Sequence, residues 1–195
     1  MALCEQLLNA NIQSDCDNPM FGGYKPIGWI INKDDILSFA TGKNDFPSVS
    51  VTSIALKEGA QAYKIQSIGS QPTATTQTFV KGTYYNTWTN VVNIALLDHG
   101  GHVVQDIITP MASGAKFVVI LEHERTERNE NDTFPAFEIF GLDKGLSLQD
   151  GASREEYGED LKGGWMLPLE ETDAPRPSHF CFDRELIEGL ETPAV

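Results

Sequence analysis

The chain has 195 residues, which is the length of one ordinary domain and excludes a many-domain protein. It carries 28 acidic residues against 14 lysines and arginines, a formal net charge of −14, which argues against a surface that grips nucleic acid or anionic lipid through charge. Nine acidic and seven basic residues fall in 1–120, whereas 19 acidic and seven basic residues fall in 121–195. The C-terminal acids are expected to form either a solvated surface or a wall that repels another polyanion.

Cysteine usage favours a reducing compartment. Cys4, Cys16 and Cys181 are too few and odd in number for a disulfide framework, and none forms a C-x-x-C pair that would indicate zinc or redox chemistry. The first residues, MALCEQLLNAN, lack the basic and apolar regions of a secretion signal, and no run approaches 18 apolar residues. We therefore expect neither classical export nor a membrane span.

Residues 1–26 are expected to form an extended N-terminal arm. Residues 2–9 suffice for one or two helical turns, but the stretch that follows is dense in Asn, Asp, Gly and Pro. Apolar side chains in this arm, such as Leu7 and Phe21, need a surface to cover them, and an adjacent subunit would provide it. A single β-rich domain is expected over residues 27–195.

Strand patterns recur along this domain. Alternating or continuous apolar runs predict strands at 27–31, 49–56, 62–68, two within 73–97 interrupted near Lys81-Gly82, 116–123, 134–140 and 164–169. The strands at 49–56 and 62–68 are expected to pair as a hairpin across a short turn. A second hairpin is expected to join 134–140 to 146–148, and the run at 116–123 is typical of a central strand buried on both faces.

One amphipathic helix is predicted between two of the longest strands. Its apolar face comprises five side chains at helical spacing, namely Val103, Val104, Ile107, Ile108 and Met111. The helix is expected to end at Gly114, to have a kinked or non-helical last turn at Pro110, and to pack on the sheet that contains 117–121.

Histidines provide the best metal candidates. Asp98, His99 and His102 cluster around two glycines before the helix, but a helix cap and surface histidines account for them equally well. His123 lies between Glu122 and Glu124, an arrangement that either raises its pKa or is ordinary solvated material. The loop at 129–132 lacks the glycine of a calcium-binding loop.

No catalytic motif is present, since the chain has no G-x-S-x-G elbow, P-loop or G-x-G-x-x-G. We therefore expect no catalytic residue, no bound cofactor, no metal and no enzyme. Three tryptophans, Trp29, Trp88 and Trp165, would favour binding of a carbohydrate or protein ligand if they gathered on one concave face.

The element order resembles the tail-tube fold of tailed bacteriophages, a β-sandwich or barrel with one flanking helix. Four stretches also resemble small virion structural proteins of phages that infect Bacteroidetes: CDNPMFGG at 16–23, IGWIINKDDI at 27–36, AFEIFGLDKGLSL at 136–148 and GGWMLPLEE at 163–171. The expected fold is thus mainly β, tail-tube-like, with one amphipathic helix and an extended N-terminal arm.

The resemblance implies a virion structural protein made in the host cytoplasm, whose stacked rings form a tail tube that conducts DNA. The implied partners are copies of the chain in symmetric rings, other virion tail or head-tail proteins, and DNA that passes without specific binding, with no membrane. A tail terminator, a head-tail connector, a capsid accessory protein and a non-viral β-sandwich that binds a ligand stay open as alternatives.

Overall fold

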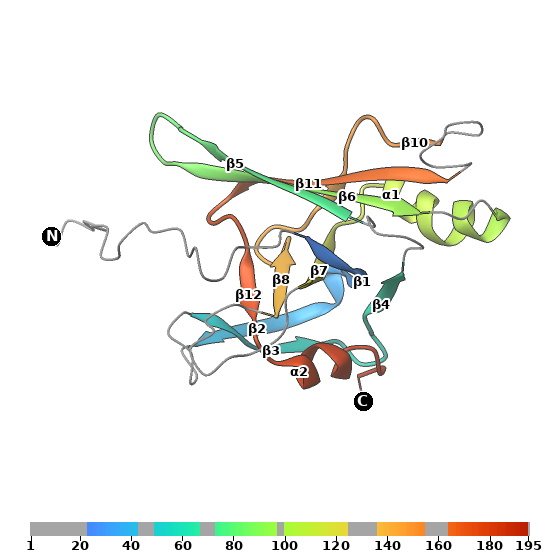
Figure 1. The fold of residues 1–195 in the computed structure, drawn as a ribbon, viewed down its shortest axis with the longest axis horizontal. Coiled ribbons are helices and arrows are strands. Elements are labelled where there is room, and N and C mark those ends of the chain that lie inside the picture. Colours follow the sequence, from blue (N-terminus) through green and yellow to red (C-terminus); the bar gives the residue numbers. More distant parts are fainter. Residues whose placement is uncertain are drawn as a thin grey trace, which may run out of the picture.

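The computed structural model describes residues 23–42, 49–66, 73–96, 100–124, 136–154 and 164–194. These residues form a mainly β structure, as predicted, with three layers stacked on one another (Figure 1). A central sheet lies between an outer sheet on one side and a two-stranded sheet with a short helix on the other. The chain regions 1–22, 43–48, 67–72, 97–99, 125–135 and 155–163, together with residue 195, lie outside this description.

The central sheet is antiparallel and follows the order β12-β8-β7-β1-β4. Its strands are β12 (His179–Cys181), β8 (Phe137–Phe140), β7 (Phe117–His123), β1 (Tyr24–Asn32) and β4 (Tyr63–Gln66). Strand β7 is buried from Phe117 to Glu122, so the prediction of a strand buried on both faces is confirmed. Both faces of this strand are apolar because each covers a different core.

The outer sheet follows the order β10-β11-β6-β5, and β9 also pairs with β11. Its strands are β10 (Ser153–Arg154), β11 (Trp165–Ala174), β6 (Thr87–Leu96), β5 (Thr73–Val80) and β9 (Ser147–Leu148). The prediction of two strands around Lys81-Gly82 is confirmed: β5 and β6 pair in register from Thr73↔Ile94 to Val80↔Thr87. Their side chains are rich in Thr, Val and Trp, which suit a pleated, half-buried surface.

The third layer consists of β2 (Ile36–Gly42), β3 (Ser50–Leu56) and the helix α2 (Arg184–Gly189). Two hydrophobic cores hold the layers together. One core, between the central sheet and the third layer, includes Trp29, Ile120, Phe137 and Ile187. The other, between the two larger sheets, includes Val92, Phe117, Val119, Leu121 and Leu169. Alternate residues of β7 therefore serve opposite cores, as the period of two in a strand requires.

The two hairpins predicted at 49–56/62–68 and 134–140/146–148 were wrong. A short turn, η1 (Lys33–Asp35), is followed by β2, a strand that was not predicted. Strand β2 pairs with β3, and β4 pairs with β1. Ile36 and Phe39 of β2 pack on the core, so burial decided a pairing that loop length alone did not.

In the second case β8 pairs with β7 and β12, whereas β9 pairs with β11 of the outer sheet. The connection crosses between layers, since Leu142 packs in one core and Leu146 in the other. Gly141 permits this crossing: its φ is +79°, and an added Cβ would lie 2.6 Å from the carbonyl oxygen of Phe117.

The predicted helix exists and packs on the sheet that contains β7, with Met111 in the shared core. It comprises a π-helical stretch, η2 (Val103–Ile108), followed by the α-helical turn α1 (Thr109–Ala112), and it ends at Gly114 with φ +89°. The last turn is regular, contrary to the expectation at Pro110. The irregularity precedes the proline, whose ring excludes an ordinary α-helical hydrogen bond to the preceding turn.

Val104 was wrongly placed on the buried face. Val103 and Met111 are buried and Ile107 is half-buried, but 42% of Val104 is exposed. The residues spaced four apart, Val103, Ile107 and Met111, face the sheet, and Val104 lies beside this row.

The C-terminal helix α2 was not predicted. Its N-cap is Asp183, whose Oδ1 accepts a hydrogen bond from the backbone N–H of Leu186 at 3.2 Å, and Ile187 anchors it in the core. At the other end of the chain, β1 begins at Tyr24, so residues 24–26 of the expected arm belong to a strand. The helical turns expected at 2–9 lie outside the described residues.

Candidate functional site

The histidines and acids proposed as metal ligands do not come together in the described part of the chain. Asp98 and His99 lie outside the described residues, as does the loop at 129–132. His102 is exposed at the start of η2, with its ring against Gly100, and His123 lies at the end of β7. Among the described residues no group of three or more His, Cys, Asp or Glu side chains is arranged to hold a metal ion.

His123 instead belongs to a buried polar network centred on Glu138. The Glu138 carboxylate is almost buried and accepts hydrogen bonds at 2.6 Å from Tyr24 Oη, Gln77 Nε2 and Ser178 Oγ. His123 Nε2 lies 3.5 Å from Glu138 Oε2, and its ring lies 5.0 Å from that of Tyr24.

Burial shifts the pKa values of two side chains in this network. It lowers the pKa of His123, against the opposing attraction of Glu138, and it raises the pKa of the Tyr24 hydroxyl, which the Glu138 charge raises further. Both side chains are therefore held in their neutral forms around one satisfied carboxylate. The network joins β1, β5, β8 and the residue before β12, which is the work of a structural clamp between two sheets.

Two further acids of the C-terminal region are also internal. Glu122 forms ion pairs with Lys25 at 2.7 Å and with Arg184 of α2. Glu171 accepts from Asn90 Nδ2 at 3.0 Å and from the backbone N–H of Lys144 at 2.8 Å. Together with Glu138, these acids hold the layers together. They therefore do not belong to the exposed acidic surface that the sequence predicted. The exposed acids of this region include Glu124, Asp150 and Asp173.

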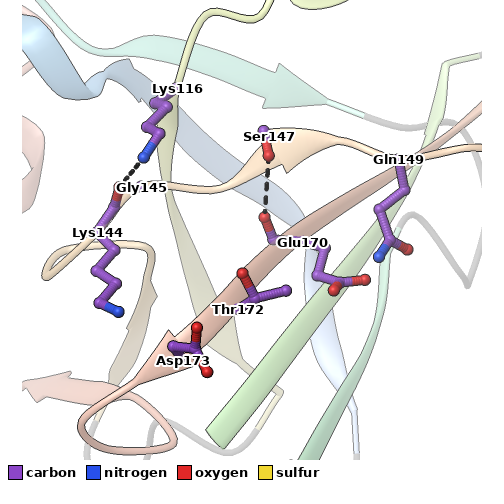
Figure 2. A pocket seen from close by; sticks show the side chains of 8 residues that line it. All are labelled: Lys116, Lys144, Gly145, Ser147, Gln149, Glu170, Thr172 and Asp173. Atoms are coloured by element: carbon purple, nitrogen blue, oxygen red, sulfur yellow. Dashed lines mark hydrogen bonds between the residues drawn. The ribbon is translucent and has the colours of Figure 1, made fainter.

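A polar hollow of about 310 Å³ lies between the Lys144 turn and β11 (Figure 2). Figure 2 shows Lys116 reaching toward the backbone of this turn, where its Nζ donates to the carbonyl oxygen of Lys144 at 3.1 Å. On the other side lie Glu170 and Asp173, the latter with a φ of +55°. Two lysines thus balance two carboxylates around a hollow that has little apolar surface. A ligand would find hydrogen bonds there but almost no area to bury.

The connection between β5 and β6 exposes a group of large side chains that we call the aromatic tip. Figure 1 shows this hairpin extending past the central sheet. Its members are Phe79, Val80, Tyr84 and Tyr85, which are 51%, 41%, 95% and 70% exposed. Gly82 shapes the turn, because an added Cβ would lie 2.1 Å from the carbonyl oxygen of Tyr85. Aromatic side chains gathered in this way mark contact sites, since isolated soluble domains seldom expose them together.

An apolar groove of about 680 Å³ lies at the opposite end of the two larger sheets, between β4 and the helix. Ile65 of β4, Leu96 of β6 and Ile107 of η2 contribute apolar walls, and Tyr63 lies at its side, 53% exposed. The charged groups lining it are Lys64 and Asp106. From the sequence, the helix residues were expected only to pack in the core. The groove could not be predicted, because it lies where three separate elements leave space between them.

The three tryptophans do not share a face. Trp29 is buried in one core, and its indole Nε1 donates to Glu191 Oε1 at 2.7 Å, which lowers the pKa of that carboxyl. Trp165 packs against the other core. Trp88 contacts Phe79 edge-to-face, with ring centroids 5.5 Å apart at the base of the aromatic tip. Cys181 is buried as a free thiol, while Cys4 and Cys16 lie outside the described residues.

Comparison of the chain with protein-family models, with curated proteins and with solved structures gives no match. In the part of the chain that the structure describes, no helix is long and apolar enough to cross a membrane.

Proposed function

We propose that this chain is a virion structural protein of the tail-tube type, a β-sandwich whose copies close into rings that stack into a conduit for DNA. The observation that carries the proposal is the aromatic tip: a paired hairpin presents Phe79, Tyr84 and Tyr85 to solvent on a chain whose described residues gather no metal-binding cluster. Such a surface is suited to protein contact.

The sheet edges favour contact with further copies. Within the described residues, β4 ends the central sheet and β5 ends the outer sheet, so each leaves one side without a partner strand. Strand edges of this kind pair readily with another chain, and a closed ring protects them.

The charge favours a conduit for a polyanion. The chain has a net charge of −14, and the acids exposed on its surface repel phosphate, so DNA slides along such a wall without adhering to it. The same charge disfavours a protein that holds DNA in place.

Electron microscopy of the purified full chain tests the proposal. We expect rings or stacked tubes with an open channel, and the tubes should retain no DNA at physiological salt. Closed shells or pairs of copies without a channel would favour a capsid accessory or connector role. A protein that stays monomeric at every concentration contradicts self-assembly altogether.

A further inference from the structure

The aromatic tip and the apolar groove are complementary in chemistry. The tip segment 79–88, FVKGTYYNTW, contains three exposed aromatic rings, one cation and no acid. The groove has apolar walls and a volume of about 680 Å³, which is ample for aromatic side chains. Each feature therefore lacks what the other supplies: the tip has rings that need cover, and the groove has apolar walls that need filling.

The two features cannot meet within one molecule. Strand β6 begins at Thr87, beside the tip, and ends at Leu96, which lines the groove. Nine residue steps at about 3.3 Å each place these ends roughly 30 Å apart on a rigid strand. Figure 1 agrees, with the hairpin connection at one end of the outer sheet and β4 and α1 at the other.

We propose that the aromatic tip of one copy docks in the groove of a second copy of this chain, with Tyr84 and Tyr85 as anchors. The inference rests on the proposed function and names the contact through which copies would assemble. A contact between two different surfaces is heterologous, so a docked pair still offers one free tip, on one copy, and one free groove, on the other. Repetition of this contact generates a ring or a filament.

Charge supports a second copy as the occupant. Lys81 is the only charged residue of the tip segment, and Asp106 is the only acid among the described residues that line the groove. Among the described residues neither side chain makes an ion pair, whereas Lys64 of the groove is already 3.4 Å from Glu191. Docking brings an unpaired cation to an unpaired acid in a molecule whose other acids would repel a copy.

The area involved is sufficient for the core of a contact. Three aromatic rings bury up to about 450 Å² on the tip side alone, against roughly 800 Å² per partner in an ordinary stable interface. Pairing along the neighbouring strand edges adds to this area.

Mixing two complementary variants tests the docking. The tip variant carries Tyr84→Ser and Tyr85→Ser, and the groove variant carries Leu96→Trp, which fills the groove from β6. We expect each variant alone to self-associate at least roughly 30-fold more weakly than the wild type in sedimentation velocity. An equimolar mixture should form a dimer and nothing larger, because only one intact tip and one intact groove remain. Leu37→Ser, which removes a 64% exposed apolar side chain from β2, should assemble like the wild type.

A charge exchange provides a second test that does not depend on Leu96→Trp folding. Lys81→Asp and Asp106→Lys should each weaken self-association about tenfold, and the double variant should recover most of the loss. Lys57→Asp changes the net charge by the same amount as Lys81→Asp at an exposed residue that belongs to neither feature, and it should have little effect.

The outcomes separate the inference from the proposed function. Suppose that the wild type assembles, and that the groove variants Leu96→Trp and Asp106→Lys assemble as strongly as the wild type or the equimolar mixture forms no dimer. The docking is then wrong, while self-assembly stands. If the wild type stays monomeric throughout, the proposed function fails and the inference fails with it.

Discussion

At the scale of single residues, Glu138 shows how a strand residue becomes a clamp between sheets. It lies in the strand predicted at 134–140, and its carboxylate is almost fully buried and accepts hydrogen bonds from Tyr24, Gln77 and Ser178. A buried carboxylate is tolerated only when its hydrogen bonds are satisfied. Two of the donors, Gln77 and Tyr24, lie 61 and 114 positions away from Glu138 in the sequence. No local pattern in the sequence could therefore reveal them.

Glu138→Gln should lower the free energy of unfolding by about 1–3 kcal/mol, because the amide group points a donor at a donor in this network. Urea unfolding followed by circular dichroism measures the change. Glu124→Gln, which alters an exposed acid on the adjacent strand end, is the matched control and should change stability by less than about 0.5 kcal/mol. Equal stability of the two variants would show that the network contributes nothing.

Cys181 should be unreactive in the folded chain, since burial raises the pKa of its thiol to about 11 and the thiolate is the reactive form. In a chain that carries Cys4→Ser and Cys16→Ser, an aromatic disulfide reagent at pH 7.5 should label Cys181 only after denaturant is added. Rapid labelling without denaturant would place the thiol at the surface.

The same shift has a consequence at alkaline pH. Between pH 9 and 11 the thiol ionises in the unfolded chain but not in the folded one, so stability falls as pH rises, by at most about 1.4 kcal/mol per pH unit. Cys181→Ala should lack this part of the alkaline loss.

At the scale of elements, the helical segment illustrates how packing overrides a spacing rule. The sequence places five apolar side chains on one face, but the π-helical stretch before Pro110 leaves Val104 in water while Val103 and Met111 are buried. The wider π-turn changes which side chains face the sheet. The π-turn arises from Pro110, whose effect on the preceding turn depends on tertiary packing.

Two substitutions on this segment should therefore differ sharply. Met111→Asp places a charge in the core between the two larger sheets and should lower the free energy of unfolding by more than about 3 kcal/mol. Val104→Asp adds the same charge at an exposed position and should be nearly neutral. Thermal unfolding of both variants distinguishes them, and a similar loss in each would mean that the helix presents a different face to the sheet.

At the scale of the whole molecule, charge and shape act in opposite directions. A net charge of −14 makes copies repel one another, whereas the aromatic tip and apolar groove attract. The repulsion extends over about 30 Å at 10 mM salt and about 8 Å at physiological ionic strength. The apolar contact does not depend on salt in this way.

Self-association should accordingly strengthen as salt rises from 10 to 150 mM, because repulsion among many acids outweighs the single Lys81–Asp106 attraction. Sedimentation velocity at a fixed protein concentration measures the shift from monomer to larger species. Weaker association at 150 mM would indicate an interface built mainly on ion pairs.

The sequence by itself determined that the fold is mainly β, and it determined the central buried strand at β7, the β5–β6 pair and the existence and end of the helix, because each depends on local periodicity and turn chemistry. Only the tertiary structure decided that β3 pairs with β2, that β4 pairs with β1, and that the segment after Gly141 crosses between layers. These choices depend on which apolar faces meet in two separate cores. The aromatic tip and the groove likewise depend on three-dimensional placement, because exposure is a property of what fails to cover a side chain, and no single stretch of sequence records it.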